Sequence, residues 1–157
     1  AASPNNVAML KGRMKFQTIG PDKLNQLRHA RMLRNLSDVK NHMERHAQIL
    51  RPKFEAVLSE LETQLGDKGI ARWNNPKGGY FISLYVEKGC AKRVEELCAN
   101  AGMILTPAGA TYPYGIDPDD SNIRIAPSFP SVEEIQKASV VLCVAVKYAV
   151  LEKLLKN

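Results

Sequence analysis

The sequence predicts an α+β chain in which a helical arm is followed by a small sheet covered by helices. Helical periodicity fills the N-terminal part, and no strand pattern interrupts it. Beyond it, strand and helix patterns alternate in the order strand, strand, helix, strand, strand, helix. The long helical pattern stops at Gly66, so we expect a helical arm over residues 1–66 and a small α+β domain over residues 67–157.

The arm is expected to contain three helices. A hydroxyl cap followed by proline places the first helix start at Ser3, and a Gly-Pro break places the second near Asp22. The third pattern runs from Ser37 to Leu65. Pro52 lies inside it and cannot donate a backbone hydrogen bond, so we expect a kink or break just before this residue.

The small domain is expected to contain four strands and two helices. The strands fall at residues 70–73, 79–86, 103–106 and 123–125, and the helices at residues 91–101 and from 132 almost to 157. The last helix should begin with a capping box, because Ser131 is followed three residues later by Glu134.

The strand at residues 123–125 carries the first candidate site residue. Its Ile-Arg-Ile pattern turns two isoleucines toward a core and Arg124 toward the opposite face. A loop rich in turn formers precedes the strand, and an arginine opposite such a loop can hold a carboxylate with two parallel hydrogen bonds. The alternatives are an exposed strand arginine, or a salt bridge to one of three loop acids, Asp117, Asp119 and Asp120.

Two motifs carry a family resemblance. The first is Pro-Lys-Gly-Gly-Tyr-Phe at residues 76–81, and the second is a Pro-x-Gly loop followed by Asn-Ile-Arg-Ile-Ala at residues 122–126. With the order of elements, they resemble the C-terminal part of fold type I, pyridoxal-phosphate-dependent aminotransferases of class I/II. That family usually has Pro-Gly where Ala108 separates proline from glycine here. This departure and the Thr-Tyr-Pro-Tyr run at residues 111–114 resemble the MocR-like branch.

The resemblance implies an enzyme that transfers an amino group from an amino acid to a 2-oxo acid with pyridoxal phosphate. It implies that Arg124 binds the substrate α-carboxylate, and that residues 1–66 are the end of a large domain and the interdomain helix. It also implies that the lysine forming the internal aldimine lies upstream of Ala1, so that this part alone is inactive and does not bind the cofactor stably. A second subunit is expected to complete a homodimer.

Thr18 and Gly20 form the second candidate site. The resemblance implies that their stretch can reach the cofactor phosphate of a second subunit, since a hydroxyl and the amides of a helix start favour phosphate. The alternative is a plain turn between two helices.

The charge distribution leaves another function open. Residues 1–53 hold eleven Lys and Arg against three acidic residues, whereas the whole chain has a net charge of only +6. Such asymmetry can mark a nucleic-acid surface. The alternative function is therefore a free-standing basic α+β module that binds nucleic acid or protein. Nucleic acid is the less favoured partner, because aromatic residues are scarce in this half and no RNP-like pattern accompanies the charge.

Composition argues against several other classes. No apolar run approaches the roughly 20 residues that cross a bilayer, so no membrane contact is expected. The three cysteines are widely spaced and lack metal-ligand spacing, which favours reduced, structural thiols in a cytoplasmic protein. His42 and His46 lie four residues apart, but zinc needs at least a third ligand, so no metal is expected.

Overall fold

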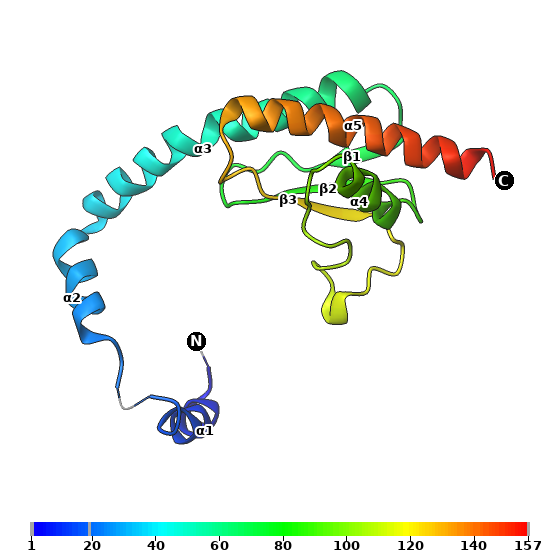
Figure 1. Cartoon of the computed structure of the whole chain (residues 1–157). Coiled ribbons are helices and arrows are strands. Elements are labelled where there is room, and N and C mark those ends of the chain that lie inside the picture. Colours follow the sequence, from blue (N-terminus) through cyan, green and yellow to red (C-terminus); the bar gives the residue numbers. More distant parts are fainter. Residues whose placement is uncertain (1, 19, 157) are drawn as a thin grey trace. The chain divides into compact units, whose positions relative to one another are not determined.

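The computed structural model describes residues 2–18 and 20–156 and has the predicted α+β class. The elements, labelled in Figure 1, are α1 (Pro4–Met14), α2 (Lys23–Met32), α3 (Leu36–Leu65), β1 (Ala71–Trp73), β2 (Ile82–Val86), α4 (Ala91–Asn100), the 3-10 turn η1 (Pro113–Gly115), β3 (Asn122–Ile125) and α5 (Val132–Leu154). Helices therefore precede a small sheet and its covering helices, as the sequence patterns predict.

The chain forms two compact units, residues 1–45 and residues 46–157. Helix α3 begins in the first unit and ends in the second. The expected division at residue 66, where the helical pattern ends, stays a prediction.

The first two helices begin where the sequence placed them, and each start has a side-chain cap. Ser3 Oγ accepts a hydrogen bond from the N–H of Asn6 at 3.3 Å, and Asp22 Oδ1 accepts one from the N–H of Asn25 at 2.9 Å. Neither helix contains a buried residue. The apolar side chains of α2 are exposed, namely Leu24, Leu27 and Met32.

Helix α3 runs through Pro52 without a break, so the expectation of a break is wrong, while a kink at this residue stays a prediction. Pro52 is exposed, and its ring costs the helix one backbone hydrogen bond. On the following turns Val57, Leu61 and Leu65 are buried against the rest of the second unit. Packing of this apolar stripe outweighs one missing bond, because most helical stability in proteins comes from such tertiary contacts.

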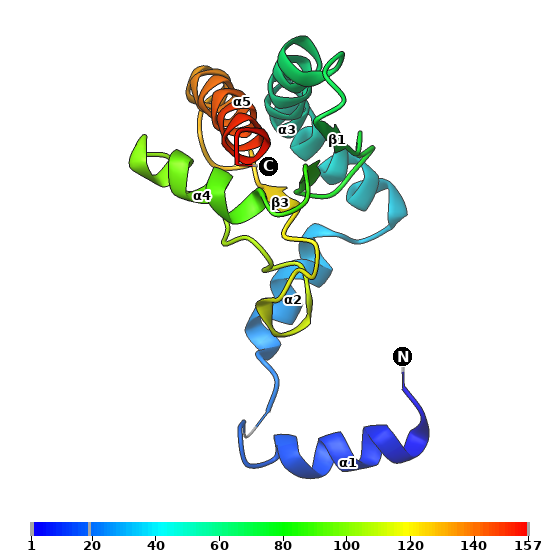
Figure 2. The same cartoon turned by 90° about the vertical axis from the view of Figure 1, so that its right-hand side faces the viewer.

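The sheet has the order β1-β2-β3, and both pairs are antiparallel. Leu84, in the middle of β2, lies opposite Trp73 of β1 and opposite Ile123 of β3. The buried apolar face of β2 and β3 packs beneath the C-terminal part of α3, α4 and α5 (Figure 2). The opposite face of the sheet is turned toward the loop at residues 107–121 (Figure 1).

Two predicted strands differ from the structure. The pattern over residues 79–86 becomes a strand only at Ile82, because Gly79 has a φ of +90° that the extended strand conformation does not allow. Residues 103–106 are not a strand at all. Met103 donates its N–H to the Cys98 carbonyl at 2.8 Å and so completes the end of α4 instead of a sheet ladder, and Ile104 is 92% exposed.

The capping box at the start of α5 is confirmed. Ser131 Oγ accepts from the N–H of Glu134 at 3.3 Å, and Glu134 Oε2 accepts from the N–H of Ser131 at 2.8 Å. Near the other end of α5, Arg93 of α4 donates to both oxygens of Glu152 at 2.7 and 2.9 Å. This paired contact joins the two helices over the sheet.

Candidate functional site

Arg124 lies on the face of β3 that looks away from the helices. Its neighbours Ile123 and Ile125 are 1% and 9% exposed and belong to the core, so the predicted alternation is confirmed. The residue opposite Arg124 on β2 is Ser83. The short strand therefore fixes the direction of the arginine by the burial of its two isoleucines.

The side chain of Arg124 is held in place but keeps unused hydrogen-bonding capacity. Its Cζ lies 4.6 Å from the centroid of the Phe81 ring, a stacking distance for a guanidinium on an aromatic face. Its Nε is buried and has no hydrogen-bond partner among the described residues. A buried cationic donor without a partner is costly, and such groups are normally satisfied. The arrangement is suited to an incoming anion.

The three loop aspartates do not pair with Arg124 in the described part of the chain; each has another role. Asp119 forms an ion pair with Lys88 at 3.0 Å, and Asp120 Oδ1 accepts from the N–H of Lys92 at the start of α4 at 3.1 Å. Asp117 accepts from the backbone on both oxygens, as described next. The salt-bridge alternative for Arg124 is therefore wrong.

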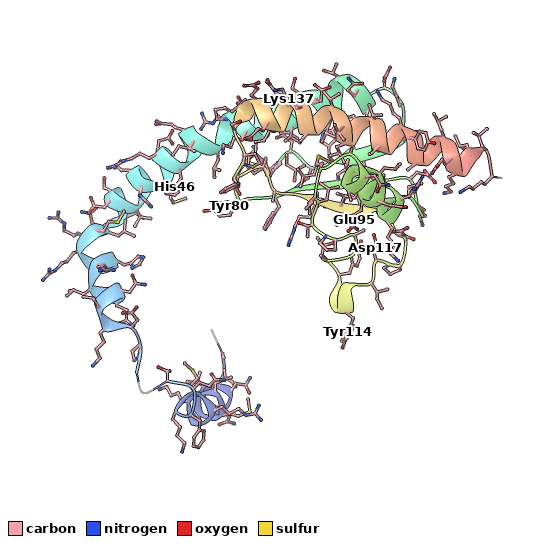
Figure 3. All side chains as sticks on the ribbon, in the orientation of Figure 1. His46, Tyr80, Glu95, Tyr114, Asp117 and Lys137 are labelled. Carbon is pink, nitrogen blue, oxygen red and sulfur yellow. The ribbon has the colours of Figure 1, made fainter. Side chains whose placement is uncertain are left out.

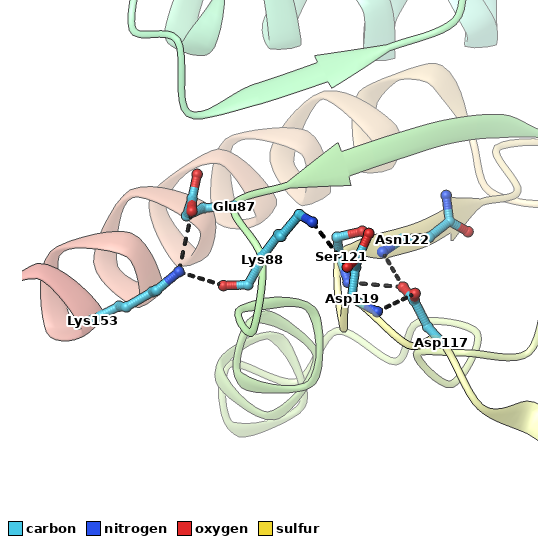
Figure 4. A network of polar contacts seen from close by, with 7 residues as sticks. All are labelled: Glu87, Lys88, Asp117, Asp119, Ser121, Asn122 and Lys153. Atoms are coloured by element: carbon cyan, nitrogen blue, oxygen red, sulfur yellow. Dashed lines mark hydrogen bonds and ion pairs between the residues drawn. The ribbon is translucent and has the colours of Figure 1, made fainter.

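Asp117 holds the entrance to β3. Its Oδ2 accepts from the N–H groups of Ser121 and Asn122, both at 2.8 Å, and its Oδ1 accepts from the N–H of Asp119 at 3.0 Å (Figure 4). These are charge-assisted bonds from a carboxylate to backbone donors, and they fix the chain two residues before Arg124.

We expect Asp117 to make stability depend on pH. Burial acts to raise the pKa of Asp117, but hydrogen bonds from the backbone of Ser121, Asn122, Asp119 and Asp120 together outweigh it, so the pKa lies below its ordinary value of 3.8. The stabilisation is present above that ordinary value and is lost as the pH falls through the lower folded-state pKa. Asp117→Asn should cost roughly 1–2 kcal/mol at neutral pH, and this cost should shrink in acid.

Urea unfolding of wild type and Asp117→Asn between about pH 6 and pH 3 measures this difference. Asp119→Asn is the matched control, because its carboxylate is in a surface ion pair that is worth little. An Asp117→Asn deficit that stays constant over this range would contradict the assignment.

Side-chain hydrogen bonds also hold the start and the middle of the loop at residues 107–121. Glu95 of α4 accepts from the N–H of Ala108 at 2.7 Å. Thr111 Oγ1 donates to Asn122 Oδ1 at 2.6 Å, and Asn122 Nδ2 donates to Ser83 Oγ at 2.8 Å. Figure 3 shows Glu95 and Asp117 at the base of the loop and Tyr114 at its tip, pointing away.

None of the residues that hold this loop stood out in the sequence as site residues. Glu95 is one acidic position of an ordinary amphipathic helix, and Asn122 was visible only as part of the Asn-x-Arg motif. A local pattern does not reveal contacts to residues that are far apart in the chain.

A cavity of about 180 Å³ borders Arg124. Its walls come from α3, α5, the end of β3 and the segment after α4, and they are mostly apolar. Thr106 and Ser139 add hydroxyl groups, and Arg124 is the one cationic side chain among the described lining residues. Most of this lining belongs to the helix side of the sheet, whereas Arg124 points to the opposite face, so we do not assign the cavity as the carboxylate site. The described lining also contains no lysine to which pyridoxal phosphate could attach.

Thr18 and Gly20 lie in the turn between α1 and α2, on either side of residue 19, which is outside the described residues. Thr18 Oγ1 donates to the Gly20 carbonyl at 2.6 Å, and the Gly20 N–H donates back to Thr18 Oγ1 at 3.3 Å. Asp22 already caps the start of α2. The hydroxyl proton and the amide at this turn are thus already used in local hydrogen bonds, and a phosphate would have to replace these bonds to be held here.

Within the described ranges, no three His, Cys, Asp or Glu residues gather as a metal ion would require. No helix in the same ranges is long and apolar enough to cross a bilayer.

The fold, the Asn-x-Arg strand and its loop are those expected for the C-terminal part of the fold type I aminotransferases that the sequence resembles. A family model described as aspartate amino-transferase matches residues 1–157, and the chain belongs to this family. The predicted family resemblance is confirmed at this level. Its assignment to the MocR-like branch stays a prediction.

Individual relatives agree with the family assignment. The chain is 45% identical over 154 residues to a putative aminotransferase of Mycolicibacterium smegmatis, covering 98% of this chain and 36% of the relative. It is 46% identical over 144 residues to an aspartate aminotransferase of Corynebacterium glutamicum, covering 90% and 33%. The chain thus spans about a third of the length of these relatives. A Bacillus subtilis protein, the uncharacterized HTH-type transcriptional regulator YdfD, is 31% identical over 106 residues, covering 68% of this chain and 21% of that protein.

Solved structures give the same result. The crystal structure of an aspartate transaminase from Corynebacterium glutamicum superposes with a TM-score of 0.88 at 43% identity, covering 97% of this chain and 36% of that one. LysN, an α-aminoadipate aminotransferase from Thermus thermophilus, reaches a TM-score of 0.76 at 20% identity, over 96% of this chain and 38% of that one. The second comparison supports the fold alone.

Proposed function

We propose that these 157 residues are the C-terminal part of a pyridoxal-phosphate-dependent aminotransferase, and that Arg124 binds the α-carboxylate of its substrates. The reaction moves an amino group from an amino acid to a 2-oxo acid. The observation that carries the proposal is the buried, unpartnered Nε of Arg124, on a guanidinium already oriented by Phe81.

A planar guanidinium suits this task for geometric reasons. It offers parallel N–H donors that match the two oxygens of a carboxylate, and its charge does not depend on pH in the range of enzyme activity. Stacking on Phe81 limits the orientations of the fork before the substrate arrives, so less entropy is lost on binding. Both substrates carry a carboxylate next to the reacting carbon, so one arginine can orient the amino acid and the oxo acid alike.

The cofactor would be bound mostly by residues outside this chain. Pyridoxal phosphate, when bound, acts as an electron sink that stabilises negative charge at the substrate α-carbon. The lysine that attaches it is proposed to lie upstream of Ala1. Thr18 and Gly20 are proposed to contact the cofactor phosphate of a second subunit, by exchanging their local hydrogen bonds in this exposed turn for bonds to the phosphate.

The partners follow from the same proposal. The arm over residues 1–66 would pack on a large domain and a second subunit of a homodimer, and the exposed apolar side chains of α2 support such contacts. We place the enzyme in the cytoplasm, because its three cysteines are unpaired and buried. The family match over the whole chain favours the enzyme over the nucleic-acid module.

Expression of the full-length protein beside the 157-residue polypeptide tests the proposal. We expect the full-length protein to carry the cofactor absorbance and to transfer amino groups, and the shorter one to do neither. Activity in the isolated 157 residues, or salt-dependent binding of nucleic acid by them without any activity in the full-length protein, would contradict it.

A further inference from the structure

We propose that Lys53 is a positioning residue for Arg124, acting from helix α3 on the chain that leaves β3. The inference rests on the proposed role of Arg124. Lys53 is half-buried, and its Nζ donates to the carbonyl of Ser128 at 2.8 Å and to that of Phe129 at 3.3 Å. It lies 75 and 76 residues away from these partners in the sequence.

The position of β3 depends strongly on what holds its ends. It is the last strand in the order β1-β2-β3, so in the described part of the chain only β2 pairs with it. At its start, the Asp117 carboxylate holds the N–H groups of Ser121 and Asn122. Beyond its end, the Lys53 ammonium holds two carbonyls in the connection to α5. A charged side chain thus fixes the backbone on each side of Arg124.

The connection between β3 and α5 transmits this constraint. It runs from residue 126 to residue 130 and contains Pro127 and Pro130, whose rings fix one backbone angle each. Pro127 is buried, and the Ser131 cap fixes the far end. The connection therefore has little conformational freedom of its own. Because a stiff connection passes a displacement on to the strand, releasing the Ser128 and Phe129 carbonyls from Lys53 should shift β3 and Arg124. A misplacement of about 1 Å in a positioned group can cost as much as about a hundred-fold in rate.

Lys53 is not itself placed to bind the substrate carboxylate. Its ammonium already donates to two backbone carbonyl oxygens in the connection that follows β3. Its effect should therefore pass through Arg124, and this can be tested by combining substitutions.

The experiment uses the full-length enzyme, with Lys53→Met in the wild-type and Arg124→Ala backgrounds. Lys53→Met keeps most of the stem and removes the charge and the donors. We expect it to lower kcat/KM for the amino acid about ten-fold, mainly by raising KM, and to lower it less than about two-fold when Arg124 is already alanine. Lys53→Arg, which can still donate to both carbonyls, should restore most of the activity.

Lys137→Met is the matched control, because Lys137 lies on the first turns of α5 in an exposed ion pair with Glu133 at 2.8 Å. It should leave kcat/KM unchanged. An equal loss from Lys53→Met in both backgrounds, or no loss in the wild type, would overturn the inference. An Arg124→Ala variant with normal kcat/KM would instead overturn the proposed function itself.

Discussion

Replacing Arg124 by lysine in the full-length enzyme should lower kcat/KM by about two to three powers of ten, for the amino acid and the oxo acid alike. In a desolvated site each charge-assisted hydrogen bond contributes about 1.5–3 kcal/mol to binding, and the substitution removes the pair of parallel bonds that arginine makes to one carboxylate. Lysine keeps the charge but has no planar fork, so this substitution is not conservative. Arg124→Ala should be at least as damaging.

Steady-state kinetics of both variants, with the cofactor absorbance recorded beside them, checks this expectation. The absorbance should remain normal, because the lysine that holds the cofactor lies elsewhere in the proposal. Arg72→Lys is a matched control. Arg72 is also stacked, with its Cζ 4.0 Å from the Tyr85 ring centroid, but it is exposed and lies on β1, at the opposite edge of the sheet from β3. Arg72→Lys should leave kcat/KM within about two-fold of wild type.

Gly109→Ala should destabilise the loop over Arg124 by at least about 2 kcal/mol and lower kcat/KM as well. Gly109 is buried and has a φ of +88°, a left-handed conformation that costs an alanine roughly 1–2 kcal/mol. A Cβ at this position would also collide with the carbonyl oxygen of Gly115, and it would lie 3.3 Å from the N of Asp117. The loop would have to open, and Asp117 would move with it.

Gly102→Ala is the control for Gly109→Ala, because it separates the cost of the left-handed backbone conformation from the cost of the steric collision. Gly102 has a similar φ of +83°, but a Cβ there would meet nothing within 4 Å. Gly102→Ala should therefore show the conformational cost alone, roughly 1 kcal/mol, with kcat/KM unchanged. Denaturant unfolding and kinetics of the two variants measure the difference. Equal effects of the two substitutions would show that the close approach at Gly109 does not matter.

The features of the fold that could be predicted from sequence were those with a local cause. Ser3, Asp22 and Ser131 cap helices through side-chain bonds that span three residues, so each start is visible in a short stretch. The alternation around Arg124 is equally local. A break at Pro52 was wrongly expected because the apolar packing that keeps α3 continuous comes from residues far along the chain.

The error at residues 103–106 has the same origin. The residue pattern at 103–106 predicts a strand, but a segment joins a sheet only if another strand lies beside it, and a local sequence pattern does not show this. The direction of Arg124 could be predicted, whereas its stacking on Phe81 and its unpartnered Nε could not, since both depend on how β2 and β3 pair. Sequence therefore located the candidate site, and the structure supplied the contacts that hold it.

The most direct test combines removal of the Arg124 guanidinium from the protein with removal of the α-carboxylate from the substrate. In the full-length enzyme, kcat/KM is measured for an amino acid and for the amine that lacks its α-carboxylate, in wild type and in Arg124→Ala. If Arg124 binds the α-carboxylate, removing that group should cost wild type about two to three powers of ten and should cost Arg124→Ala almost nothing more. Equal losses in the two proteins would show that the carboxylate and Arg124 do not interact, and would contradict the proposed site.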